Sequence, residues 1–168
     1  TSMVACGDAD GAVTGNTRRF GASLEKIKQV VDVRKGEVMF GLNMIVHKGK
    51  TIFIGDTSVH EYPTSEQMAE IAISTARVVR LFGFDPRVAF VSHSTFGQPL
   101  TSRTKHIKKA VDILKDKNVD FEFDGDMQPD VALNSEYEEL YPFSKIVGKA
   151  NILIMPGQHS AAISYKLM

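Results

Sequence analysis

The sequence of 168 residues lacks several features that would place it in a specialised class of protein. It contains a single cysteine, Cys6, and therefore cannot form an internal disulfide, which favours a reducing compartment such as the cytoplasm. Lysine plus arginine and aspartate plus glutamate number 20 each, so no excess of positive charge indicates nucleic acid or an anionic membrane as a partner. The longest apolar runs, at residues 87–91 and 152–155, are far shorter than the roughly 20 residues of a membrane-spanning helix.

The composition that is present is that of an ordinary globular domain. Hydrophobic residues make up 43% of the chain, charged residues 24% and aromatic residues 8%, which excludes disordered and low-complexity classes. The chain starts at Thr1 inside a predicted strand and stops at Met168 inside a predicted helix. We therefore expect residues 1–168 to be a single domain fragment, truncated at both ends relative to a longer parent.

Strands and helices alternate along the sequence. Apolar runs and turn residues predict a β-hairpin with Gly49 in its turn, further strands and a series of amphipathic helices. The hairpin is predicted at 37–47 and 51–55, the strands at 3–6, 87–91, 121–123 and 152–155, and the helices at 17–31, 64–82, 101–117, 129–140 and 161–168. This alternation predicts an α/β fold with a mainly parallel sheet, helices on both faces and a β-hairpin.

The helix at 64–82 has the clearest signals. Thr64 is followed three residues later by Gln67, the spacing of a capping box, and Gly83 ends the helix. The helical spacing predicts a buried stripe made of Met68, Ile71, Ala72, Thr75 and Val79.

Four polar loops follow the predicted strands, at 8–16, 92–99, 124–130 and 155–160. Because ligands of parallel sheets bind outside the carboxyl ends of the strands, we expect these loops to gather on one side of the sheet. The acids of the first and third loops lack the spacing of metal ligands, and turn or helix-capping roles suit them better. We therefore predict no metal site.

In the first loop Thr14 and Gly15 precede a helix, where a hydroxyl, backbone N–H groups and close approach at glycine suit an anion. Arg18 and Arg19 add two fixed positive charges, although adjacent helical residues face different directions, so at most one of them faces a site. The alternative is a glycine-rich turn with a helix cap and no ligand.

The second and fourth loops offer hydroxyl groups just before helices. Ser94 and Thr95 in the second loop and Ser160 in the fourth are suited to a phosphate or thioester oxygen. Histidine is a residue type used in acid–base chemistry, but no aspartate partner of His93 is evident, so we expect a structural histidine. The segment is no Gly-x-Ser-x-Gly elbow, which gives a serine hydrolase no support.

Taken together and in order, these segments resemble the phosphate acetyl/butyryl transferase family. The resemblance is carried by Ala-Asp-Gly-Ala-Val-Thr-Gly, Ser-His-Ser-Thr-Phe-Gly and Phe-Asp-Gly-Asp-Met-Gln-Pro-Asp, with further matches at 56–59, 63–72, 86–89, 150–156 and 163–166. It implies one domain of the two-domain architecture shared by phosphotransacetylases and isocitrate dehydrogenases.

Within that family the chain is most similar to the phosphotransacetylase-like domain at the C-terminus of bacterial NADP-dependent malic enzymes. Thr-Gly-Asn-Thr-Arg-Arg at 14–19, Val-His-Glu at 59–61 and the pair His159-Ser160 point to this branch. The resemblance implies an acetyl-CoA-binding regulatory module that forms a homo-oligomer, a dimer through this domain. The conversion of malate to pyruvate, CO2 and NADPH, with its NADP and divalent cation, would belong to an N-terminal region absent here.

Two alternatives stay open. The chain could be part of a free-standing phosphate acetyltransferase, which converts acetyl-CoA and phosphate to acetyl phosphate and CoA, or a structural sub-domain without a site of its own. The resemblance implies CoA, acetyl-CoA and phosphate as ligands. It implies ligand-binding roles for Thr14, Gly15, Arg18, Arg19, Ser94, Thr95, Ser160 and Lys166.

The resemblance also implies what this chain does not carry. The family's catalytic Ser, Arg and Asp lie downstream of the position of Lys166, so the 168-residue chain is expected to be inactive as a transferase. A CoA-contacting Arg of free-standing transferases aligns with about Glu25, whose carboxylate would repel a phosphate.

Overall fold

The computed structural model describes all 168 residues and divides into two compact units, Thr1–Glu37 and Val38–Met168, which are described separately. Unit Thr1–Glu37 holds the short helix α1 (Ser2–Ala5) and the helix α2 (Phe20–Lys28), which confirms the helix predicted within 17–31.

The strand predicted at 3–6 is wrong, because these residues form α1. A strand needs a neighbour to bond its backbone, and this unit contains none. The N–H groups of Val4 and Ala5 instead bond the carbonyl of Thr1.

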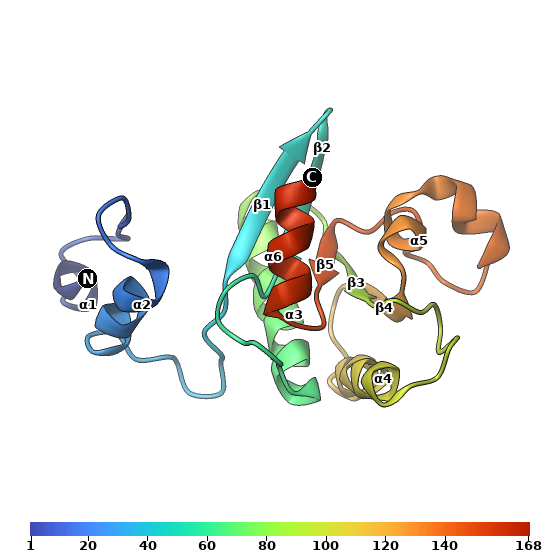
Figure 1. Cartoon of the computed structure of the whole chain (residues 1–168), viewed down its shortest axis with the longest axis horizontal. Helices are drawn as coiled ribbons and strands as arrows, with labels where there is room; N and C mark the ends of the chain where they lie inside the picture. Colours follow the sequence, from blue (N-terminus) through green and yellow to red (C-terminus); the bar gives the residue numbers. More distant parts are fainter. The chain divides into compact units, whose positions relative to one another are not determined.

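Unit Val38–Met168 is built on one five-stranded sheet (Figure 1). The strands lie in the order β1-β2-β5-β3-β4; β1 and β2 are antiparallel and the other neighbouring pairs are parallel. Gly49, with φ +77°, makes the turn between β1 and β2. The mainly parallel sheet and the hairpin are thus confirmed. The strands span Leu42–His47 (β1), Lys50–Gly55 (β2), Arg87–Val91 (β3), Glu122–Met127 (β4) and Ile152–Ile154 (β5).

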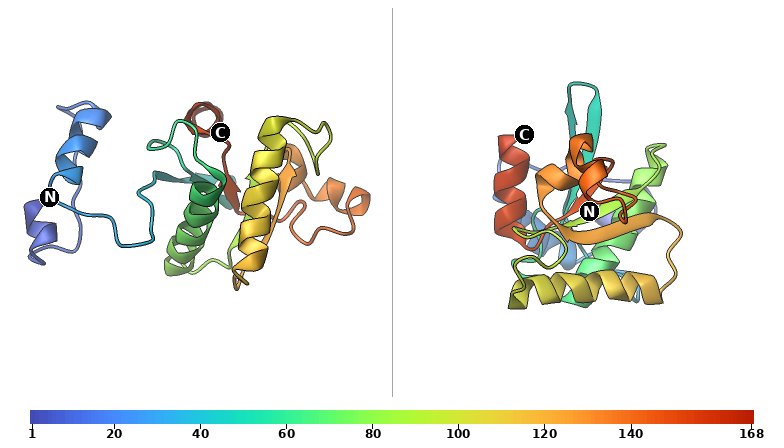
Figure 2. Two further views of the ribbon diagram at one scale, coloured as in Figure 1. Left: turned by 90° about the horizontal axis from the view of Figure 1, so that it is seen from below. Right: turned by 90° about the vertical axis from the view of Figure 1, so that its right-hand side faces the viewer.

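Helices cover both faces of this sheet, as predicted. Alternate residues of β3 face opposite ways, so that Val88 and Phe90 pack in one hydrophobic cluster and Ala89 and Val91 in the other. The first cluster lies against α3 (Ser65–Leu81) and α4 (Ser102–Asp116), which run side by side (Figure 2). The second lies against α5 (Pro129–Leu133) and α6 (Gln158–Leu167).

The capping box of α3 is confirmed. The Thr64 hydroxyl accepts the N–H of Gln67 at 3.2 Å, and the Thr64 N–H donates to the Gln67 side chain at 2.8 Å. Every residue of the predicted stripe on this helix is buried. An ion pair of 2.7 Å joins Glu66 to Lys109 of α4, and this hydrogen bond from the ammonium is the main cause that lowers the pKa of Glu66 to about 2.

Several predicted boundaries need correction. The first strand of the hairpin, predicted at 37–47, begins at Leu42, and the last helix, predicted at 161–168, begins at Gln158. The helix predicted at 129–140 breaks at Asn134, whose extended backbone separates α5 from the 3-10 helix η1 (Ser135–Leu140) and whose side chain accepts the Glu136 N–H. The strand predicted at 121–123 continues as β4 into the third predicted loop. It does so through Gly125, with φ +152°, where a Cβ would come within 2.7 Å of the Phe90 carbonyl oxygen, a space only glycine can occupy.

Candidate functional site

A cleft lies where the parallel strands β3 and β5 end. One cavity, of about 360 Å³, is lined there by residues that follow or end these strands and by residues from α4 and α6. A second, of about 350 Å³, adjoins it and shares Arg103, Ile107 and Pro156. We call the two together the carboxyl-end cleft. Its polar wall is made by Ser92, His93, Arg103, Ser160 and Ser164 in the first cavity, and by Thr64, Ser102 and His106 in the second.

Arg103 is the one arginine or lysine on the wall of this cleft. Its guanidinium carbon lies 5.0 Å from the centre of the Tyr62 ring, a cation–π contact between two exposed side chains. The N-cap of α4 is Thr101, so Arg103 lies in the first turn of the helix. A guanidinium in this position can bind a phosphate or carboxylate with two parallel hydrogen bonds.

Below the floor of the cleft, two serines and an aspartate form a buried hydrogen-bonded chain. The Ser94 hydroxyl donates to the Asp126 carboxylate, and the Ser92 and Ser94 hydroxyl oxygens are 3.1 Å apart. The second carboxylate oxygen of Asp126 accepts the Gly97 N–H at 3.0 Å. Ser94 and Asp126 are almost completely shielded from solvent, whereas Ser92 reaches the cavity wall.

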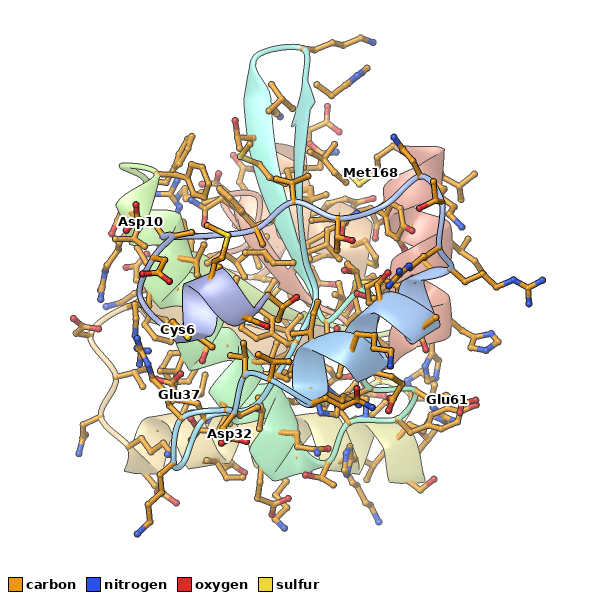
Figure 3. All side chains as sticks on the ribbon, turned by 90° about the vertical axis from the view of Figure 1, so that its left-hand side faces the viewer. Cys6, Asp10, Asp32, Glu37, Glu61 and Met168 are labelled. Carbon is orange, nitrogen blue, oxygen red and sulfur yellow. The ribbon has the colours of Figure 1, made fainter.

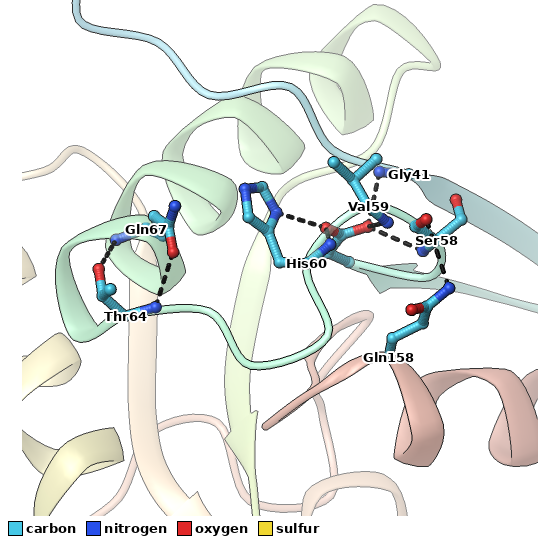
Figure 4. A network of polar contacts seen from close by, with 8 residues as sticks. Gly41, Ser58, Val59, His60, Thr64, Gln67 and Gln158 are labelled. Carbon is cyan, nitrogen blue, oxygen red and sulfur yellow. Dashed lines mark hydrogen bonds and ion pairs between the residues drawn. The ribbon is translucent and has the colours of Figure 1, made fainter. Parts of the chain in front are cut away.

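A second buried carboxylate, Asp56, organises the loop after β2 (Figure 4). Its oxygens accept backbone N–H groups from Gly41, Ser58, Val59 and His60 at 2.8 to 3.1 Å. The Nδ1 atom of the His60 ring lies 2.7 Å from the same carboxylate. This arrangement fixes the path of the chain from the sheet to the cap of α3, and so positions the wall of the second cavity.

The structure brings some of the sequence-predicted residues to the carboxyl-end cleft and leaves others elsewhere. Ser160 lines the first cavity, but Ser94 lies wholly buried beneath it. The Thr95 hydroxyl accepts the Gln128 N–H at 3.3 Å. Lys166 is exposed near the far end of α6, the end marked by Met168 in Figure 3, and contacts the ring of Tyr165.

The remaining predicted residues belong to unit Thr1–Glu37. Thr14, Gly15 and Arg18 line a hollow of about 250 Å³ within that unit. Arg19 is the N-cap residue of α2 and is not part of the wall of this hollow. Glu25 is exposed and lies 3.5 Å from Lys28.

Sequence reasoning missed Arg103 because a basic residue on an amphipathic helix is typical of a solvated face. Its position in the sequence could have identified it, because Arg103 comes two residues after the cap at Thr101, at the end of the loop that follows β3. Asp126 was missed as the partner of the serines because the sequence separates it from Ser94 by a whole helix, and only parallel pairing of β3 with β4 joins them.

A larger cavity, of about 670 Å³, lies at the opposite, amino ends of β2, β3 and β5. Two of its cationic side chains are already engaged. Arg87 donates to the Lys149 carbonyl at 2.7 Å, and the Lys149 ammonium pairs with Glu138 at 2.9 Å. We therefore place the candidate ligand site at the carboxyl-end cleft, where Arg103 has no carboxylate partner.

The structure contains neither a cluster of metal-ligand side chains nor a membrane-spanning helix. No group of three or more histidine, cysteine, aspartate or glutamate side chains is placed so that it could hold a metal ion. No helix is both long enough and apolar enough to cross a membrane.

The chain belongs to the phosphate acetyl/butaryl transferase family, which it matches over residues 1–168. It is 46% identical over 99% of its length to an NADP-dependent malic enzyme of Rhizobium meliloti (strain 1021), and 32% identical to a phosphate acetyltransferase of Buchnera aphidicola subsp. Schizaphis graminum (strain Sg). It covers 22% and 24% of these two relatives, respectively. The chain therefore spans about a fifth to a quarter of the length of these curated relatives.

Solved structures agree with this assignment. A phosphotransacetylase from Streptococcus pyogenes superposes with a TM-score of 0.91 at 28% identity, over 98% of this chain and 51% of that one. A phosphotransacetylase from Staphylococcus aureus superposes with a TM-score of 0.86 at 27% identity, over 98% and 52%. The fold is thus that of about half of a phosphotransacetylase chain.

Proposed function

We propose that this chain is an acyl-CoA-binding domain that regulates, and helps to assemble as a homo-oligomer, an NADP-dependent malic enzyme. The sequence identity of 46% to such an enzyme supports a malic enzyme as the longer protein to which the chain belongs. The observation that supports the ligand is the carboxyl-end cleft, with Arg103 on the wall of both of its cavities. The chemistry on malate, with NADP and a divalent cation, belongs in this proposal to the part of the relatives that the chain does not cover.

The walls of the cleft suit the two chemical parts of an acyl-CoA. Val91, Ile107 and Met155 form an apolar surface that can pack against the alkyl portions of a pantetheine arm. Arg103, together with Ser160 in the first turn of α6, supplies donors and positive charge for a phosphate. An effector of this kind regulates only through a difference in affinity between two states of the whole enzyme.

A second candidate is phosphotransacetylase catalysis, which the 32% identity to a phosphate acetyltransferase favours. In that reaction the CoA thiolate attacks acetyl phosphate, and cations and N–H donors stabilise the developing oxyanion. The cleft offers Arg103 as a cation, but the described side chains around it contain no carboxylate that could accept the thiol proton.

We therefore expect the 168-residue chain to form no acetyl-CoA from CoA and acetyl phosphate above the uncatalysed rate. The reaction is followed by the appearance of the thioester, with a phosphotransacetylase as the positive control. Robust turnover by the chain would contradict the assignment of transfer chemistry to residues outside it and would favour the second candidate.

The arginine pair next to α2 gives a test of regulation in the longer protein. We propose the hollow lined by Thr14, Gly15 and Arg18 as a second anion contact, separate from the carboxyl-end cleft. Arg18→Ala combined with Arg19→Ala should then weaken acetyl-CoA binding by the longer protein about tenfold, because a charge-assisted hydrogen bond contributes about 1.5–3 kcal/mol. Since Arg18 shares a hollow with Thr14 and Arg19 does not, Arg18→Ala alone should carry this loss and Arg19→Ala serves as its matched control. Titrating acetyl-CoA while following NADPH formation measures it. Identical curves for all variants would show that both arginines are only surface residues.

A further inference from the structure

The buried chain of Ser92, Ser94 and Asp126 has a defined direction of hydrogen bonding. A carboxylate can only accept, so the Ser94 proton is committed to Asp126. The Ser94 oxygen is then free only to accept, and the Ser92 hydroxyl 3.1 Å away must donate to it. Burial enforces this order, since Ser94 is 0% exposed and no water can offer it another partner.

This direction of hydrogen bonding, from Ser92 to Ser94 to Asp126, makes Ser92 an acceptor on the cavity wall. A hydroxyl in a ligand site ordinarily rotates to donate or accept as the ligand requires. Here the proton of Ser92 points into the protein, and one of its lone pairs receives the Ser94 N–H at 3.4 Å. The other lone pair remains for the cavity, since the Nδ1 atom of the exposed His93 ring lies at a distant 3.5 Å.

We propose that Ser92 is the dedicated hydrogen-bond acceptor of the carboxyl-end cleft and that it binds an amide N–H of the ligand's pantetheine arm. Ser94 and Asp126 are positioning residues that hold the Ser92 proton away from the ligand. This inference rests on the proposed acyl-CoA ligand and deepens it, because it divides the polar side chains of the first cavity into donors and an acceptor. The donors Arg103 and Ser160 face the anionic or carbonyl groups, and Ser92 faces an N–H. The pyrophosphate bridge of CoA, which carries only acceptors at neutral pH, is excluded from contact with Ser92.

The test is calorimetric titration of the 168-residue chain with acetyl-CoA, with CoA and with the adenine nucleotide portion of CoA, which lacks the pantetheine arm. Ser92→Ala should weaken acetyl-CoA and CoA alike, by about fivefold to tenfold, and leave the nucleotide portion unchanged. An unchanged affinity for acetyl-CoA overturns the proposal, as does a loss shared by the nucleotide portion. A loss confined to CoA would assign Ser92 to the thiol proton and would overturn the amide assignment.

The positioning role is tested by Ser94→Ala, which frees the Ser92 hydroxyl to rotate and should lower acetyl-CoA affinity even though Ser92 is present. Ser94→Thr keeps the hydroxyl and should bind acetyl-CoA more tightly than Ser94→Ala. If it does not, the positioning role of Ser94 is contradicted. If Ser94→Ala does not fold, the Ser92→Ala titrations decide alone. If the wild-type chain binds no acetyl-CoA, the proposed function fails. If Arg103→Ala weakens acetyl-CoA binding and Ser92→Ala does not, only the assignment of Ser92 as an acceptor fails.

Discussion

Replacing Asp56 with alanine should destabilise unit Val38–Met168 by about 3 kcal/mol or more, the largest stability effect expected of a single polar side chain in this structure. The carboxylate is 2% exposed and accepts four backbone N–H groups, from Gly41, Ser58, Val59 and His60. Alanine leaves these donors without their acceptor in a loop that has little access to water. A loss of this size is a large fraction of the 5–15 kcal/mol that typically holds a domain folded.

Urea unfolding of the 168-residue chain measures this effect. Asp56→Asn keeps the shape but offers only one accepting oxygen, so its loss should lie between wild type and Asp56→Ala. Asp112→Ala is the matched control, because Asp112 makes only an exposed ion pair with Lys115 on one helix and should change stability by less than about 0.5 kcal/mol. Equal stability of Asp56→Ala and Asp112→Ala would show that the N–H groups around Asp56 find water instead.

Much of the fold was predictable because its signals are local. The capping box at Thr64 and Gln67 and the turn at Gly49 depend on residues a few positions apart, and the structure confirms both. The buried stripe of α3 follows from the 3.6-residue period alone. Strands dense in apolar residues and flanked by helices likewise indicated a parallel sheet covered on both faces.

The predicted elements and boundaries that proved wrong are those that local sequence does not determine. A run of four apolar residues at 3–6 suits a strand or a helix equally, and α1 forms because unit Thr1–Glu37 offers no strand for it to pair with. β4 extends through Gly125 because the close approach of Phe90 requires a glycine, a condition set by a neighbouring strand. The end of the helix at Asn134 depended on a single side-chain cap.

The location of the candidate site was predictable from the sequence, but the residues that line it were only partly predictable. The rule that ligands bind at the carboxyl ends of parallel strands pointed to the loops after β3 and β5, and Ser160 does line the cleft there. Whether a serine faces a cavity or lies beneath it depends on packing, which is why Ser94 and its neighbour Ser92 could not be told apart. Arg103 was indistinguishable from solvated cations because only the packing of α4 against α3 and β4 brings its first turn to the cleft.

Replacing Arg103 with alanine should weaken acetyl-CoA binding by tenfold to about a hundredfold. Arg103 is the only arginine or lysine that lines the carboxyl-end cleft, and losing a charge-assisted hydrogen bond costs about 1.5–3 kcal/mol. Arg103→Lys should recover part of the affinity, because it restores the charge without the planar pair of donors. Lys105→Ala removes the same charge from the same helix without touching either cavity, and should leave the affinity unchanged at moderate salt.

The most direct measurement of the central claim is therefore the dissociation constant of acetyl-CoA for the 168-residue chain, compared by calorimetry between Arg103→Ala and Lys105→Ala. If the carboxyl-end cleft binds acyl-CoA, the Lys105 variant titrates like wild type and the Arg103 variant binds at least tenfold more weakly. Equal constants for the two variants, or no heat of binding with the wild-type chain, would contradict the cleft as an acyl-CoA site.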